Sequence, residues 1–170
     1  MSAYNHIEYM EAVASSLNVL LHKPNKKRFF ISTGLVSMEG IIANLPSAHL
    51  PCLIAEDNSE ERISDNISDN LLSMPFYTFY ILYAAPPGND LKILEARQNA
   101  KNTAKKVLSK MLHNRLDADL GLDLVDYNSI RILGVGPIAD NAHGVMVSFS
   151  LIQPSGITYN PEDWNNGTHS

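Results

Sequence analysis

The sequence predicts an α+β protein: a mostly antiparallel sheet of four or five strands, two long helices packed on one face, and an extended acidic hairpin. Apolar residues recur at helical spacing in residues 5–22 and 90–115, which indicates two amphipathic helices. Residues 145–152 alternate between apolar and other side chains, as is typical of a half-buried strand. The last two predicted strands are joined by a loop that suits an antiparallel pair.

The first predicted helix, over residues 5–22, has a clear beginning and end. Asn5 is suited to cap its N-terminus, with Glu8 three residues later as in a capping box. Pro24 ends the helix, because proline lacks the backbone N–H that another turn would need. The elements that follow are a short strand at 29–33, a short helix at 36–44 and a short strand at 50–55.

Residues 56–70 differ in character from the segments around them. They hold six of the eighteen acidic residues, and only Ile63 and Ile67 are bulky and apolar. Such a composition favours an exposed hairpin or an extended loop. The six acidic residues are Glu56, Asp57, Glu60, Glu61, Asp65 and Asp69.

The second half of the chain is predicted to contain a long strand, the longest helix and a final pair of strands. Aromatic residues are frequent in residues 71–85, a composition typical of a strand covered on both faces. A turn at 86–89 precedes the helix, whose alanine and lysine content favours helix formation. Strands are expected at 124–133 and 145–152, with a turn or bulge at 134–137 between them.

The length and composition are those of a globular chain. The protein has 170 residues, of which 45% are hydrophobic and 18% charged, and its formal net charge is −5. We expect a single domain over residues 1–153 and a C-terminal extension over residues 154–170 that serves as an interaction tail. No apolar run is long enough to cross a bilayer, and the first residues lack the pattern of a signal peptide, so we expect neither.

No pattern in the sequence indicates catalysis. There is no G-x-S-x-G motif, and the single cysteine, Cys52, lies among apolar residues that favour a buried structural thiol over a reactive one. The six histidines lack the spacing of a metal site. Residues 56–61 resemble a calcium loop only in composition, since they lack the central glycine and the bidentate glutamate. We therefore expect no enzymatic activity, no metal and no cofactor.

Cationic residues gather on the predicted helix 90–115, which holds seven of the thirteen lysines and arginines. This face can be solvated, can bind nucleic acid, or can meet an acidic surface of a neighbouring protein. Nucleic acid is the least favoured of the three, because the helix has no aromatic residue on which a base could stack. In the third case the acidic segment of another copy is a candidate, and head-to-tail association would close a ring. The residues assigned to this interface are Arg97, Lys101, Lys105, Lys106 and Lys110.

Several segments together resemble a known group of proteins. In chain order they are Asp65–Asn70, Phe76–Tyr83, the long alanine- and lysine-rich helix, Ser129–Ile132, Gly144–Leu151 and Tyr159–Trp164. Their order resembles the tail-completion and tail-terminator proteins of tailed bacteriophages, and related neck or ring proteins. The resemblance covers roughly residues 45–164.

The resemblance implies a structural virion protein. Such proteins form rings of six or twelve subunits where the head connector meets the tail, and DNA passes through the lumen without sequence-specific binding. They contact adjacent connector or tail-tube proteins and have no cofactor. The resemblance further implies assembly in the cytoplasm of a bacterial host and a place in the neck or tail of the virion.

The residues are compatible with such a ring in two respects. The acidic hairpin can line the lumen, where repeated negative charge repels phosphate, or it can contact the next ring. Tyr159 and Trp164 are apolar anchors that can dock the tail on a neighbouring subunit, although Trp164 can equally pack on its own domain.

A different class of protein also fits the sequence. It is a small cytoplasmic α+β binding module that uses the basic helix 90–115 to contact an acidic partner or nucleic acid. A ring protein predicts particles several times larger than one chain. The binding module predicts a monomer or dimer whose retention on a polyanion resin depends steeply on salt.

Overall fold

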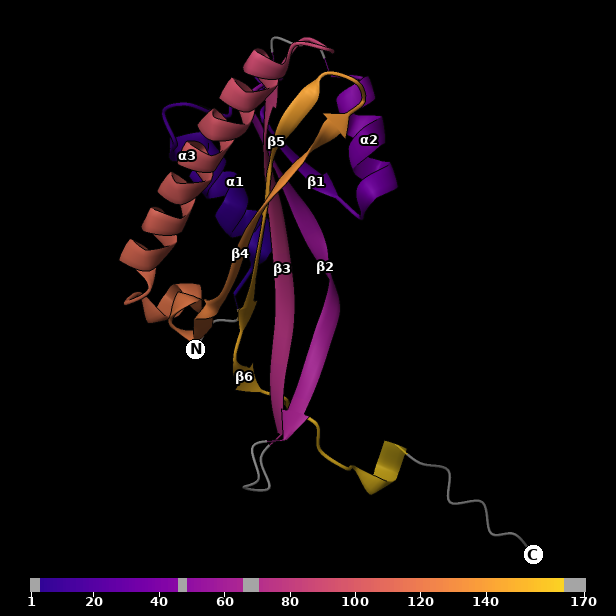
Figure 1. Cartoon of the computed structure of the whole chain (residues 1–170). Coiled ribbons are helices and arrows are strands. Elements are labelled where there is room, and N and C mark those ends of the chain that lie inside the picture. The colour runs from indigo at the N-terminus through magenta and orange to yellow at the C-terminus, as the bar shows by residue number, and fades with distance from the viewer. Residues whose placement is uncertain (1–3, 46–48, 66–70, 164–170) are drawn as a thin grey trace, which may run out of the picture.

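The computed structural model describes residues 4–45, 49–65 and 71–163. The predicted α+β class is confirmed (Figure 1). The helices are α1 (His6–Ser16), α2 (Leu35–Ala43) and α3 (Asp90–Asn114). The strands are β1 (Phe29–Ser32), β2 (Cys52–Asp65), β3 (Leu71–Ala84), β4 (Val125–Ile138), β5 (Ala142–Leu151) and β6 (Gln153–Pro154). Three short 3-10 turns, Ala118–Leu120, Leu122–Leu124 and Pro161–Asp163, complete the described elements.

The sheet is larger than predicted and its pairing is mixed. In the described part of the chain six strands pair in the order β1-β2-β3-β5-β4, with β6 beside β3. Only β1 and β2 run parallel, because α2 connects them as a crossover. The other pairs are antiparallel.

The helices cover both faces of the sheet, not one. α1 and α3 pack on the face that carries Leu53, Phe79 and Val147, where the larger core lies. α2 packs on the opposite face, where Met38 and Ile42 meet alternate residues of the same strands. Figure 1 shows α1 and α3 on one side of the strands and α2 on the other.

Only one of the two helices predicted to be long is long. α3 has 25 residues, but α1 has 11 and ends at Ser16, not at residue 22. Leu17 has extended backbone angles, and the N–H groups of Leu20 and Leu21 both donate to its carbonyl. The apolar spacing that extends the predicted helix to residue 22 includes Leu21, which is 39% exposed, whereas Leu20 beside it is buried in the core. The sequence pattern was therefore wrong about the length of the helix and about burial in its last turn.

Two strands are longer than predicted because neighbouring strands supply their hydrogen-bond partners. β2 runs through the acidic segment to Asp65, paired with β3 as far as Leu71. β4 continues through Gly134 and Val135, which pair with Val145 and Gly144 of β5. The predicted break at 134–137 is therefore an irregularity within β4, where the register shifts between Val135 and Ile138.

The far end of the β2–β3 hairpin projects beyond the helices (Figure 1). We call this projection the arm and define it as residues 60–65 of β2, residues 71–76 of β3, and β6. It begins at a register shift between Glu56 and Glu60, which is a place where strands commonly bend. In the described part of the chain, no arm residue belongs to either core cluster.

Aromatic side chains join the root of the arm to the N-terminal segment. Tyr77 stacks on Phe149 of β5 at a ring-centroid distance of 5.7 Å, and Tyr4 meets Tyr77 edge-on at 5.1 Å. His6 adds a hydrogen bond of 2.9 Å between its Nε2 and the carbonyl oxygen of Thr78. The arm is therefore anchored firmly where it leaves the body.

Candidate assembly surfaces

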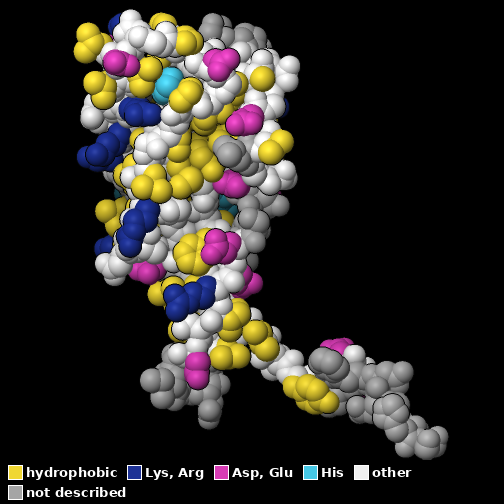
Figure 2. All heavy atoms as spheres, turned by 45° about the vertical axis from the view of Figure 1, so that its right-hand side comes forward, with side chains coloured by type: hydrophobic (Ala, Val, Ile, Leu, Met, Phe, Trp, Pro, Cys, Tyr) yellow, Lys and Arg dark blue, Asp and Glu magenta, His cyan; other side chains and the backbone are white. Residues whose placement is uncertain are grey.

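The outer face of α3 carries four of the five basic residues assigned to an interface. Lys101, Lys105, Lys106 and Lys110 are exposed, because the buried side of the helix is formed by small and apolar residues such as Ala100, Ala104 and Val107. Figure 2 shows lysine and arginine side chains along the left edge of the body. The cationic face is thus a continuous helix surface that the core leaves free.

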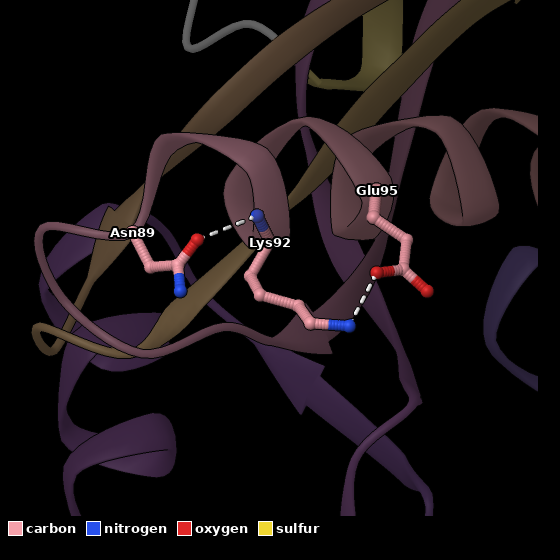
Figure 3. Close-up of polar contacts among 3 residues, drawn as sticks. All are labelled: Asn89, Lys92 and Glu95. Carbon is pink, nitrogen blue, oxygen red and sulfur yellow. Dashed lines mark hydrogen bonds and ion pairs between the residues drawn. The ribbon is translucent and has the colours of Figure 1, made fainter.

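The N-terminus of α3 is stabilised by local contacts. The Asn89 side chain accepts a hydrogen bond of 3.1 Å from the Lys92 backbone N–H, and Lys92 Nζ lies 2.8 Å from Glu95 Oε2 (Figure 3). This ion pair and the pair between His22 and Glu11 are the two within 4.0 Å among the described residues. None of the four exposed lysines farther along the helix has such a carboxylate partner within residues 4–45, 49–65 and 71–163.

The fifth basic residue, Arg97, lies apart from the lysines. It is half-buried, and its Nη2 donates a hydrogen bond of 3.2 Å to the carbonyl oxygen of Gly136 on β4. Arg97 therefore holds α3 against the β4–β5 end of the sheet. Its charge is largely unavailable to a partner that binds the outer face of the helix.

The acidic residues of β2 do not form one patch. Side chains alternate between the faces of a strand, so Glu60, opposite Phe76, points to the α2 face of the sheet. Glu61 and Asp65, opposite Pro75 and Leu71, point to the α1–α3 face. The side chain of Asp57 and the whole of Asp69 lie outside the described part of the structure.

Glu56 and Glu61 each accept a hydrogen bond from a hydroxyl group of β3. Glu56 accepts a hydrogen bond of 2.9 Å from the Tyr80 hydroxyl, and Glu61 accepts one from Ser73. Burial and the Glu56 carboxylate raise the pKa of Tyr80, so this hydroxyl stays protonated as a donor. Glu60 and Asp65 are exposed on opposite faces of the arm, where a neighbouring molecule could reach either.

The arm also exposes apolar side chains. Ile63 pairs with Ser73 and Leu71 pairs with Asp65, so Ile63 and Leu71 are diagonal neighbours on one face. Both are exposed, as is Ile152 just before β6. Figure 2 shows hydrophobic side chains along the narrow lower part of the molecule. Sequence reasoning noted Ile63 but did not place it beside Leu71, because that contact depends on the register of β2 and β3.

The residues after β6 leave the arm and run away from the body (Figure 1). Gly156 has a φ of +66°, a conformation that glycine adopts without strain, and it redirects the chain. Beyond it Ile157 is 60% exposed and Tyr159 is 70% exposed. The other predicted anchor, Trp164, lies outside the described residues.

The cysteine thiol and the possible metal ligands of the body form no reactive or metal-binding group among the described residues. Cys52 is buried, as predicted, and burial raises the pKa of its thiol to about 12, so the thiol is unreactive. The described residues contain no group of three or more histidine, cysteine, aspartate or glutamate side chains that could hold a metal ion. In the described part of the chain, no helix is both long and apolar enough to span a bilayer.

His143 of β5 is a buried group that sequence reasoning did not single out. It is 3% exposed, and neither ring nitrogen has a hydrogen-bond partner among the described residues. It lines a cavity of about 360 Å³ together with Pro87, Ile93 and Asp140. Burial and the nearby Arg97 lower the pKa of the His143 ring, which favours its neutral form. A single histidine in a strand carried no sequence signal for this environment.

Comparison with known proteins gives no relative to set beside this geometry. No protein-family model matches the chain, and no match is found among curated proteins or solved structures.

Proposed function

We propose that the protein is a non-enzymatic structural component of a tailed-phage virion. It forms a homomeric ring at the junction of neck and tail, as a tail terminator or a tail-completion protein, around the passage for DNA. Copies of the chain contact one another in the ring, and the ring contacts the adjacent connector or tail-tube proteins.

The observation that carries this proposal is the arm. Ordering the backbone costs about 1–2 kcal/mol per residue, a cost that domains usually offset by burying apolar surface. The arm adds no residue to either core cluster in the described part of the chain, yet it exposes Ile63 and Leu71 side by side. Such an element gains its stabilising contacts when a neighbouring subunit covers it.

The distribution of charge supports head-to-tail contact. The exposed lysines lie on α3, whereas Glu60 and Asp65 lie on the arm, which projects away from the helices. Two unlike patches on separate parts of one molecule favour heterologous contacts, and these close into a ring when the rotation between subunits allows it. The order of sequence motifs supports the phage neck as the place of that ring.

Electron microscopy and light scattering of the purified full-length chain test the proposal. We expect particles several times the mass of one chain, with a central hole in micrographs. Their abundance should fall in high salt, because salt screens contacts between exposed charges. A chain that stays monomeric or dimeric at every concentration and salt level would contradict the ring. Neighbouring genes for portal and tail proteins would support the phage assignment.

One observation favours a second candidate function, the small cytoplasmic binding module. The four exposed lysines of α3 lack carboxylate partners within 4.0 Å among the described residues, so they are available to an external polyanion. This module predicts a monomer or dimer that a polyanion resin retains at low salt and releases steeply as salt rises. Size and retention, measured on the same preparation, discriminate the two functions.

A further inference from the structure

The outer edge of β1 is an open edge of the sheet. β1 pairs with β2 on one side, and no described strand pairs with it on the other. The Leu53 N–H donates to the Arg28 carbonyl, and backbone groups alternate along a strand. Phe29 and Ile31 therefore direct their own N–H and C=O groups away from β2, where an added strand can bind them.

A groove of about 340 Å³ runs along this edge. Its lining combines apolar side chains from β1 and α2 with polar groups from α1 and the loop before β1; the residues are Glu11, His22, Lys27, Phe29, Phe30, Ile31 and Ile41. Ile31 is 52% exposed, although it belongs to a strand. An edge of this kind fits an extended peptide that carries apolar side chains at alternate positions.

We propose that residues 157–160 of a second copy bind along the free edge of β1 as an added antiparallel strand, followed by the 3-10 turn Pro161–Asp163. Ile157 and Tyr159 are exposed and two residues apart, so in an extended segment both side chains point to the same side. Opposite residues of an antiparallel pair share a face, so these two side chains lie over Ile31 and Phe29. The inference rests on the proposed ring and adds a second contact between its subunits, besides that between α3 and the arm.

Charge sets the direction of the added strand. Lys26 and Lys27 are exposed immediately before β1, and Glu162 and Asp163 are exposed shortly after Tyr159. Antiparallel pairing places this acidic pair beside the two lysines, whereas parallel pairing carries it to the other end of β1. Opposite charges across the contact favour the antiparallel arrangement.

The chain's own tail cannot reach this edge. Ile31 pairs with Ala55, whereas Pro154 lies beside Leu72, which pairs with Ser64. Along β3, seven residues separate Phe79, opposite Ala55, from Leu72, a distance of roughly 23 Å at about 3.3 Å per residue. The three residues from Pro154 to Ile157 span at most about 11 Å. The occupant is therefore a different molecule of the same sequence.

Cysteine cross-linking between full-length chains tests the contact. We would mix chains carrying Ile31→Cys with chains carrying Ile157→Cys, which the register places directly opposite, under mild oxidation. Thr158→Cys is the matched control, because its side chain points to the opposite face of the added strand. We expect covalent dimers from the first mixture, at least about tenfold more abundant than from the control. The native Cys52 is buried and its thiol has a pKa raised to about 12, so it adds little background.

The outcomes separate this inference from the proposed function. Rings in micrographs without cross-links at these positions, or equal cross-linking through Thr158→Cys, would overturn the tail contact and leave the ring intact. Cross-linked chains that never close into rings would support the contact and contradict the ring. If neither cross-links nor large particles form, both the tail contact and the ring are overturned. Lys26→Glu with Lys27→Glu should lower the cross-linking yield several-fold, and circular dichroism of each variant verifies the fold.

Discussion

Two neighbouring residues of β5, His143 and Gly144, are constrained in different ways. His143 is buried with no hydrogen-bond partner for its ring among the described residues, so a proton added to it would be poorly accommodated. The Arg97 guanidinium of α3 opposes protonation of the ring, and Asp140 is the other ionisable residue that lines the same cavity. Gly144 lies against the backbone of β3, where no side chain fits.

We predict that His143 makes the folded state sensitive to acid. An unfolded histidine has a pKa of about 6.5, and that of His143 in the folded protein is lower. Below about pH 6.5 the unfolded chain therefore binds more protons than the folded one, so stability falls as the pH falls, whereas above it this residue has no effect. Between pH 8 and pH 5, the free energy of unfolding measured in urea should fall more for the natural chain than for His143→Gln. Equal losses would contradict the prediction.

We predict that Gly144→Ala is strongly destabilising. A Cβ at this position would overlap the carbonyl oxygen of Ile81 and lie 2.9 Å from its carbonyl carbon, and neither backbone atom can move without displacing β3. The expected loss in the free energy of unfolding is about 3 kcal/mol or more. Gly134→Ala is the control, because a Cβ there has no atom within 4 Å, and its effect should stay within about 1 kcal/mol. Denaturant unfolding measures both.

At the scale of single elements, α3 was predicted closely and β2 was not. The helix was expected over residues 90–115 and spans Asp90–Asn114, because its capping residue, its composition and its apolar spacing all indicate the same element. β2 extends to Asp65 through a segment of low apolar content, since its hydrogen bonds come from β3 and not from its own sequence. Local sequence patterns therefore miss elements that form only because they pair with a neighbouring strand.

The candidate sites likewise include residues that the sequence placed correctly and residues that it did not. The lysines of α3 lie where helical spacing placed them, whereas the acidic residues are separated onto two faces by the alternation of a strand. Successive side chains of a strand point to opposite faces, so this separation can be predicted only once residues 56–65 are known to be a strand. Arg97 and His143 could not have been placed from sequence, because their contact with the β4–β5 end of the sheet depends on tertiary packing.

We predict that reversing charge on the outer face of α3 weakens assembly without unfolding the chain. Lys105→Glu with Lys106→Glu should reduce the assembled fraction several-fold in light scattering, because both side chains are exposed and outside the core. The matched control, Lys105→Arg with Lys106→Arg, keeps the charge and should assemble normally.

The pairing itself is tested by a compensating change on the arm. Chains carrying Glu60→Lys and Asp65→Lys, mixed with the Lys105→Glu/Lys106→Glu chains, should recover part of the assembled fraction. The two acidic residues lie on opposite faces, so the double change covers whichever face meets the helix. Unchanged assembly of the Lys105→Glu/Lys106→Glu chains, with a native circular dichroism spectrum, would remove this face of α3 from the interface.

At the scale of the whole molecule, a packed body and a projecting arm share one continuous sheet. The body holds both core clusters, whereas the arm is a narrow ribbon of β2 and β3 with β6 beside it. The sequence predicted the α+β class, but it could not show that the sheet extends past its helices. Nothing in the aromatic pattern of residues 71–85 distinguishes the half that crosses the body from the half that forms the arm.

We predict that amide hydrogen exchange is slow in the body and faster in the arm. Amides of Phe79–Leu82 in the body should exchange slowest, because they are buried between the two helical layers. Amides in residues 60–65 and 71–76 should exchange at least tenfold faster in the isolated chain and become protected when it assembles. Exchange from the arm that is as slow before assembly as after it would contradict a role in subunit contact.

The aromatic anchorage at the root of the arm has a mechanical consequence. Tyr77, Phe149 and Tyr4 interlock where β3 enters the body, and β3 continues from there through the centre of the sheet between β2 and β5. A pull along the arm therefore loads the hydrogen bonds of two flanking strands in parallel, as a shearing force, instead of peeling them open one at a time.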